Sequence, residues 1–302
     1  MDERATQSGV LSYGMFDYVL NVFSESPDLA AHVNIFMKNL HKSPDAGDSI
    51  VRMAIFAGSA DKVMVCRPDI DASLSVSSLG AGWIAFRQIL NQLLLRSTEK
   101  MHDRIHGASM ARSNGATLVI SGDQGSGKTT MSVAMAERGL MPVCDDFTAI
   151  SRQTGLIEPL PLGCTFDEGT FSRFPNLLCL QHDEYKFWSE EKWQWTVNLS
   201  DRYPIASIQQ NPRPTHFFFL TPDHGHESCI MECGQVEAIT RYLESRVIPS
   251  YEKRSAKQHG SVWDHRLALI QRLIRETRFF HVVNGCIEQT ADMIYAASSE
   301  MG

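Results

Sequence analysis

The stretch ATLVISGDQGSGKTT, residues 116–130, passes from an apolar, β-branched run directly into a glycine-rich loop. From Gly122 to Thr129 it matches G-x-x-x-x-G-K-[ST], the P-loop (Walker A) pattern. Glycines let such a loop curl until successive N–H groups point into one concavity, and a following helix adds its own unpaired N–H donors. A strand before the loop and a helix after it are the context that predicts a phosphate site.

The loop predicts a site for ATP and Mg²⁺. Lys128 is expected to neutralise the β- and γ-phosphates, and the Thr129 hydroxyl is expected to hold Mg²⁺. Gly139 is well placed to end the helix that follows. The residues expected to surround the nucleotide are Gly122, Asp123, Gln124, Gly125, Ser126, Gly127, Lys128, Thr129 and Thr130.

Two adjacent acids, Asp145 and Asp146, end the next apolar run, residues 140–144. Carboxylates at the C-terminal end of a strand beside such a loop reach the metal and the γ-phosphate. One of them can bind the metal while the other accepts the proton of an incoming hydroxyl. The alternative is a pair of acids that only caps a turn.

Together these motifs resemble the HPr kinase/phosphorylase family and its HPr-kinase-like relatives, which share a P-loop fold with phosphoenolpyruvate carboxykinase. The resemblance covers about residues 100–150 and includes the His106-Gly-Ala start, the loop itself, and a Glu-Arg-Gly helix end before the paired acids. It implies an α/β fold with a P-loop kinase core of the HPr kinase/PEP carboxykinase type. It also implies Asp145 as the catalytic base, Asp146 as a support for the metal, and His106 as a residue of the phosphate site.

The acceptor follows from the resemblance alone, as a serine or threonine hydroxyl of a protein or peptide. A small-molecule hydroxyl is the alternative. True HPr kinases have a further glycine-rich loop after the acids, whereas residues 159–170 here carry acids and glycines in another order. Candidates for the missing groups are Asp167 or Glu168 as a metal ligand, and Arg173 or Arg202 as a clamp on the γ-phosphate; each competes with a plain surface role.

Two further functions stay open. A non-catalytic nucleotide sensor could bind a partner through the tryptophan-rich stretch 188–195, although alternating buried aromatics of a strand explain that stretch too. A carboxykinase-like lyase needs a specialised pocket that the sequence does not show. Relatives often form symmetric assemblies, which leaves a homo-oligomer open.

The composition limits the functional classes and the cellular compartment to which the protein can belong. A net charge of −7 over 302 residues argues against a general binder of nucleic acid or of acidic membranes. No apolar run approaches the ~20 residues that span a bilayer, and the start lacks the layout of a signal peptide. The seven cysteines include no Cys-x-x-Cys pair, which favours reduced thiols and a cytoplasmic protein.

Hydrophobic periodicity predicts a smaller N-terminal α+β portion over residues 1–80 and the catalytic domain over 81–302. In the first part it predicts helices over 15–23 and 28–40, strands over 49–58 and 62–66, and a loop over 68–78. A long helix is expected from about Trp83 to Met101, and residues 156–197 are expected to be strand and loop. Further on, strands are expected over 215–220 and 279–283, and helices over 236–245, over 262–278 and from Ile287.

One cluster has the residue types of a zinc site: His224, His226, Cys229 and Cys233. Its spacing is unusual for zinc. If residues 228–233 form a strand, Cys229, Met231 and Cys233 share one face, as a core stripe does. The lone residues His32 and His281 are expected to be structural.

Overall fold

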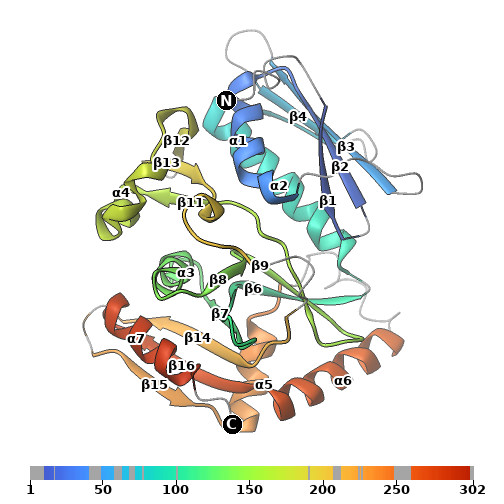
Figure 1. The fold of residues 1–302 in the computed structure, drawn as a ribbon. Coiled ribbons are helices and arrows are strands. Elements are labelled where there is room, and N and C mark those ends of the chain that lie inside the picture. The colour runs from blue at the N-terminus through green and yellow to red at the C-terminus, as the bar shows by residue number, and fades with distance from the viewer. Residues whose placement is uncertain are drawn as a thin grey trace. The chain divides into compact units, whose positions relative to one another are not determined.

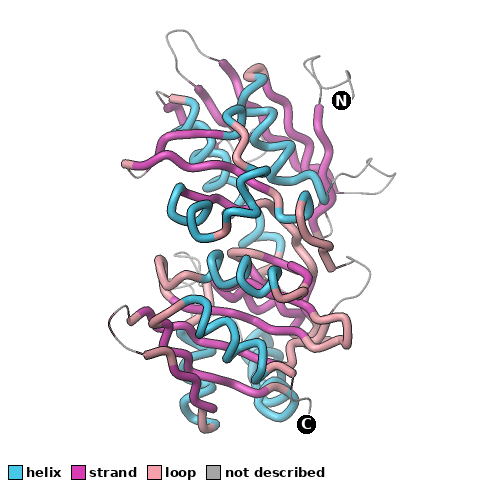
Figure 2. The backbone as a smooth tube through the Cα atoms, turned by 60° about the vertical axis from the view of Figure 1, so that its left-hand side comes forward, coloured by secondary structure: helices cyan, strands magenta, loops and turns pink. Residues whose placement is uncertain are grey.

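The computed structural model describes residues 10–16, 18–40, 49–57, 63–67, 72–76, 78–99, 101–189, 191–206, 212–223, 225, 227–247 and 260–299. The chain divides into unit 1, Met1–Ser97 with Leu162–Arg202, and unit 2, Thr98–Pro161 with Tyr203–Gly302. This division differs from the one expected at residue 80, because the first unit extends to Ser97 and later takes back a middle segment. Both units mix helices and strands, as Figure 2 shows. None of the helices built from the described residues has the length and apolarity needed to cross a membrane.

Unit 1 contains a five-stranded sheet in the order β1-β2-β3-β4-β5. Its second strand overturns the helix expected over residues 15–23: β1 and β2 form an antiparallel hairpin, and Phe16 turns between them with φ +51°. The β-branched Val19 and Val22 suit a pleated ladder, so strand pairing outweighed the helical spacing. A strand also forms inside the expected loop 68–78. The strands are β1 (Val10–Met15), β2 (Tyr18–Ser24), β3 (Ser49–Ala57), β4 (Val63–Arg67) and β5 (Ala72–Val76).

Two helices, α1 (Pro27–Met37) and α2 (Leu79–Ser97), pack together beside this sheet (Figure 1). Ser26 caps α1 by accepting from the Leu29 N–H, with Pro27 as the first helical residue. This confirms the predicted helix start. The long second helix is confirmed as well, although it begins at Leu79 and ends at Ser97.

The middle segment of unit 1 forms the antiparallel sheet β11-β13-β12. Buried Trp195 packs edge-on against Phe171, whereas Trp188 is 53% and Trp193 44% exposed. Residues 156–197 therefore contain strands as expected, but also the short helix α4 and two 3₁₀ helices, Pro175–Leu180 and Asp183–Tyr185. The elements are β11 (Cys164–Asp167), α4 (Glu168–Arg173), β12 (Lys186–Ser189) and β13 (Lys192–Val197).

Unit 2 is an α/β unit whose mixed sheet has the order β10-β9-β6-β7-β14-β16-β15, with β8 also pairing β6. The central strands β7, β14 and β16 run parallel, so their carboxyl ends share one edge of the sheet. Phe217 and Phe279 stack across this sheet with ring centroids 5.2 Å apart. The strands are β6 (His102–Ala111), β7 (Thr117–Gly122), β8 (Met141–Cys144), β9 (Phe147–Ser151), β10 (Ile157–Glu158), β14 (His216–Pro222), β15 (Cys229–Glu232) and β16 (Arg278–Asn284).

Four helices accompany this sheet in two pairs, α3 with α7 and α5 with α6. Tyr242 of α5 packs edge-on against Phe217 of the sheet. The three helices expected after residue 230 are all present. The helices are α3 (Lys128–Glu137), α5 (Gln235–Glu244), α6 (Gly260–Glu276) and α7 (Ile287–Ala297).

Candidate functional site

The loop between β7 and α3 is curled by two glycines. Gly125 and Gly127 have φ of +80° and +92°, in the left-handed region that glycine adopts without a steric cost. Gly127 also precedes the first residue of α3, so the helix begins where the loop closes. The strand before the loop and the helix after it are as predicted, and Gly139, with φ +87°, follows the helix end.

Two residues outside the motif hold this loop in place. A side chain at Gly122 would meet the carbonyl oxygen of Leu220 and the Ser126 hydroxyl, both 2.6 Å from its Cβ. From the end of β16, the Asn284 amide donates to the carbonyl of Ser126 at 3.4 Å. The loop is therefore packed against the carboxyl ends of β14 and β16. Sequence reasoning missed Asn284, because only its position after an expected strand pointed to this edge.

The side chain of Lys128 folds back over the preceding residues of the loop. Its Nζ donates to the carbonyls of Gly122 at 2.9 Å and Asp123 at 2.8 Å, and the residue is only 6% exposed. Burial lowers the pKa of Lys128, while the carboxylates of Asp146, Asp145 and Asp123 act in the opposite direction. A buried cation with carboxylates around it is thus fixed at the mouth of the loop.

The two acids follow β8, the strand that pairs with β6. Asp145 is half-buried, and its Oδ2 accepts from the Thr129 hydroxyl at 3.4 Å. Asp146 is exposed, and of the three carboxylates it has the largest electrostatic effect on Lys128. The structure therefore brings both predicted acids to the loop, each beside a different loop side chain.

His106 of β6 completes this group. Burial and the nearby Lys128 charge lower its pKa, whereas the Asp146 carboxylate, a hydrogen bond to the Asp146 backbone and Asp123 raise it. The Asp146 carbonyl also accepts from the Gly107 N–H at 3.2 Å. A His106 with a lowered pKa is mostly neutral near pH 7, so it adds little positive charge between Lys128 and Asp146.

Beside the first loop residues lies a cavity of about 190 Å³, here called the loop-side cavity. It is lined by residues of β6, of β14, of the β7–loop junction, and of α5 and the three-residue segment after it. That segment runs alongside β6, since the His106 N–H donates to the Ser245 carbonyl at 2.9 Å. The lining residues that matter below are His106, Gly122, Asp123, Arg241, Glu244 and Arg246.

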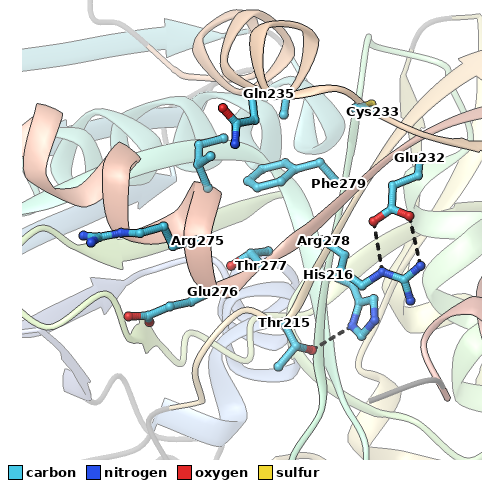
Figure 3. A pocket seen from close by; sticks show the side chains of 12 residues that line it. Thr215, His216, Glu232, Cys233, Gln235, Arg275, Glu276, Thr277, Arg278 and Phe279 are labelled. Carbon is cyan, nitrogen blue, oxygen red and sulfur yellow. Dashed lines mark hydrogen bonds and ion pairs between the residues drawn. The ribbon is translucent and has the colours of Figure 1, made fainter. Parts of the chain in front are cut away.

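A larger cavity, of about 510 Å³, lies near the amino ends of β14 and β16, at the other end of these strands from the loop. Figure 3 shows Arg278 facing Glu232 and His216 facing Thr215 in this cavity. Arg278 makes two bonds of 3.1 Å to the Glu232 carboxylate, and His216 Nδ1 lies 2.8 Å from the Thr215 hydroxyl. These polar groups are engaged with one another, and none of the residues predicted for the nucleotide site lines this cavity, although Cys233 of the zinc candidate does.

Four sequence candidates belong to the other unit. Asp167, Glu168, Arg173 and Arg202 all lie in unit 1, whereas the loop lies in unit 2. Asp167 caps α4 by accepting from the Thr170 N–H at 2.9 Å and pairs with Lys192, which is a structural role.

The zinc candidate is only partly visible, because His224 and His226 lie outside the described residues. Within the described part of the chain, no three metal-binding side chains come together. The expected strand is present as β15, but the expected core stripe is wrong. Met231 is 51% exposed, because β15 is the edge strand of the sheet.

Comparisons with known proteins add no relative. No protein-family model matches this chain, and no curated protein matches it. The likeness to HPr kinases accordingly rests on the motifs of residues 100–150.

Proposed function

We propose that this chain is an ATP- and Mg²⁺-dependent phosphotransferase with a P-loop core of the HPr-kinase type, which transfers the γ-phosphate of ATP to a hydroxyl group. One observation carries the proposal. Lys128 is buried over a loop curled by positive-φ glycines, and two carboxylates and the Thr129 hydroxyl lie around it. A phosphate-binding cradle and a metal-binding oxygen set in one place are the main requirements of phosphoryl transfer.

The loop residues fit ATP by charge and by direction. The N–H groups at the start of α3 and the Lys128 ammonium can hold the β- and γ-phosphates, which replace the Gly122 and Asp123 carbonyls as partners of Nζ. The Thr129 hydroxyl and the Asp145 carboxylate are hard oxygen ligands of the kind that Mg²⁺ prefers. Mg²⁺ bound there supplies positive charge that offsets the charge of the phosphates.

The contacts of the two acids favour an exchange of the metal-binding and proton-accepting roles that the sequence predicted for them. Asp145, expected as the base, contacts the predicted metal-binding hydroxyl of Thr129. Asp146, expected beside the metal, has a larger electrostatic effect on Lys128 than Asp145 has, and its backbone is hydrogen-bonded to His106. We therefore assign Asp145 to the metal and Asp146 to the proton of the acceptor hydroxyl, with His106 as a positioning residue for Asp146.

The acceptor class has two candidates. The resemblance to HPr kinases implies a serine or threonine hydroxyl on a protein or peptide. A small-molecule hydroxyl is the second candidate. The loop-side cavity favours this candidate, because its volume of about 190 Å³ is below that of the usual pocket for a drug-sized ligand and therefore suits a small acceptor.

The variant Lys128→Ala tests the proposal. Titration with a fluorescent ATP analogue measures nucleotide binding, and ADP release measures turnover. Loss of the charged donor is expected to weaken binding at least about tenfold. The matched control is Lys192→Ala, which removes an exposed lysine of unit 1 and is expected to bind like the unchanged protein. Equal binding by both variants contradicts the nucleotide site. Binding without phosphoryl transfer or hydrolysis leaves the nucleotide sensor as the function.

A further inference from the structure

The loop-side cavity shares its wall with the predicted catalytic groups. Gly122 and Asp123 line it, and their carbonyls are the partners of Lys128 Nζ. His106 also lines it and is hydrogen-bonded to the backbone of Asp146. Lys128 and Asp146 do not line the cavity themselves, but each is hydrogen-bonded to residues that do, so an acceptor there is separated from them by a single layer of residues.

Arg246 is one of the residues that line the cavity, and its Nε lies 3.4 Å from Asp103 Oδ2. Asp103 is fully buried and also accepts from the Tyr242 hydroxyl at 3.1 Å. This ion pair holds the Arg246 side chain close to the cavity that the residue lines.

Asp103 neutralises Arg246 only in part. Its single carboxylate also forms ion pairs with Arg152 at 2.9 Å and with Arg266 at 3.4 Å. The Asp103 carboxylate therefore divides its charge among three guanidiniums, and an anion in the cavity can pair with Arg246 as well.

A second arginine, Arg241, lines the same cavity from α5. Its Nε pairs with Glu237 at 2.8 Å on the same helix, a partly exposed pair. Asp123 and Glu244 bring negative charge to the lining as well. Two arginines and two acids thus line the cavity, and this combination suits a ligand that carries both a carboxylate and an amino group.

The volume limits the occupant. At a share of about 30 Å³ for each water in the liquid, about 190 Å³ equals roughly six water molecules. A single amino acid or a short hydroxy acid is of this size, whereas a longer chain would have to continue outside.

We propose that the loop-side cavity binds the carboxylate of a small hydroxyl-bearing acid, the phosphoryl acceptor, with Arg246 and Arg241 as its specificity residues. This inference rests on the proposed phosphotransferase function. In the reaction the acceptor oxygen forms a bond to the γ-phosphorus, and the bond from that phosphorus to the β,γ-bridging oxygen breaks. The electron pair of the broken bond leaves with ADP, and the proton of the hydroxyl moves to the Asp146 carboxylate.

Acceptor trials on the unchanged full-length protein test this first. ADP release is measured with serine, threonine and glycerate, and with serinamide and glycerol as counterparts that lack the carboxylate. At least one acid is expected to exceed its uncharged counterpart about 10- to 100-fold in kcat/KM, the effect of a lost charged hydrogen-bond partner. Serine and glycerate together show whether the amino group contributes.

Variants locate the effect in the cavity. Arg241→Gln, on the surface of α5, and Arg246→Lys, which keeps the charge that pairs with Asp103, are expected to raise KM for the acid about tenfold or more. The KM for ATP should stay unchanged. The matched control is Arg275→Gln on α6, an exposed arginine that lines the larger cavity instead. Its kinetics should equal those of the unchanged protein.

The outcomes separate the two claims. If ATP is bound and hydrolysed but acids and uncharged counterparts react equally, this inference fails and the proposed function stands. The same holds if a serine peptide is phosphorylated and no small acid competes with it. If ATP is not bound at all, the proposed function fails first and takes the inference with it.

Discussion

Thr129 and Asp145 are 16 residues apart in the chain, yet the hydroxyl of the first donates to the carboxylate of the second at 3.4 Å. The contact joins the first turn of α3 to the end of β8. It puts a carboxylate next to the one hydroxyl that the loop motif assigns to a metal. The next residue, Asp146, acts more strongly than Asp145 on the charge of Lys128, and its backbone is hydrogen-bonded to His106. Neighbouring acids thus acquire different surroundings and, in our proposal, different tasks.

Asparagine at either acid should separate these tasks. Asp146→Asn is expected to lower turnover by about 10²- to 10⁴-fold, the usual contribution of a general base, with nucleotide affinity little changed. Asp145→Asn is expected to raise the Mg²⁺ concentration needed for half-maximal activity. Titration of ADP release against Mg²⁺ measures both effects. The opposite pattern would restore the roles expected from the sequence.

Gly122→Ala should damage the cradle by overpacking. The new Cβ would lie 2.6 Å from both the Leu220 carbonyl oxygen and the Ser126 hydroxyl, and the former is backbone that cannot turn away. We expect a loss of about 1–3 kcal/mol in the free energy of unfolding, together with weaker nucleotide binding. Urea unfolding and nucleotide titration measure the two. Gly225→Ala is the control: Gly225 is exposed, its Cβ would meet nothing within 4 Å and its φ lies outside the left-handed region, so it should stay within about 0.5 kcal/mol.

The free energy of unfolding should decrease as the pH is lowered, because buried His216 resists protonation in the folded protein. Burial, and the charges of Arg278 and Arg112, lower the pKa of His216 to about 4, against the opposing effect of Glu232. Between about pH 6.5 and 4 the unfolded chain takes up a proton that the folded chain does not, so lowering the pH favours unfolding. The unfolding free energy should drop by up to about 2 kcal/mol between pH 7 and pH 5 from this residue.

His216→Phe is the test of that pH dependence. Phenylalanine keeps an aromatic ring beside Phe218 and Phe280, whose centroids lie 6.0 and 6.1 Å from that of His216. The variant should lose less stability than the parent protein from pH 7 to pH 5, as measured by urea unfolding at each pH. Between pH 7 and 8 the two proteins should change alike. An unaltered slope in the variant would assign the acid sensitivity to other groups, of which buried His32, with its pKa lowered by burial to about 4, is the first candidate.

Alanine substitutions at two tryptophans of the hairpin β12–β13 should differ sharply in their cost to the free energy of unfolding. Trp195→Ala removes a side chain that is 2% exposed, and a cost of about 3–5 kcal/mol is expected. Trp193 is 44% exposed, meets Trp188 edge-on and has the Lys186 ammonium over its ring, so Trp193→Ala should cost less than about 1 kcal/mol. Urea unfolding compares them. Comparable losses would mean that the exposed ring is buried in solution, as at a partner interface.

Local signals predicted the parts of this fold that are locally determined. The loop geometry follows from Gly125 and Gly127, and the start of α1 follows from Ser26 and Pro27, because positive φ and capping need only neighbouring residues. The hairpin β1–β2 was missed, since its apolar residues suit either period and the ladder with the neighbouring strands decided between them. Nothing local marks the return of residues 162–202 to unit 1.

The site shows the same division. Lys128, Thr129 and the paired acids could be predicted, because motif and spacing are read along one short stretch. Asn284 could not, since it reaches Ser126 across 158 residues of chain. Arg246 likewise becomes meaningful only through Asp103, a buried carboxylate that no sequence pattern connects to it.

The order of these segments also governs when the cradle can exist. A chain leaving the ribosome carries Lys128 and both acids well before Leu220, whose carbonyl lies against Gly122, and before Asn284, which braces Ser126. Residues 162–202 meanwhile join the unit that was synthesised first. The nascent chain therefore contains every motif residue long before the proposed binding site can close. Nucleotide affinity should appear during synthesis only after residue 284 has emerged.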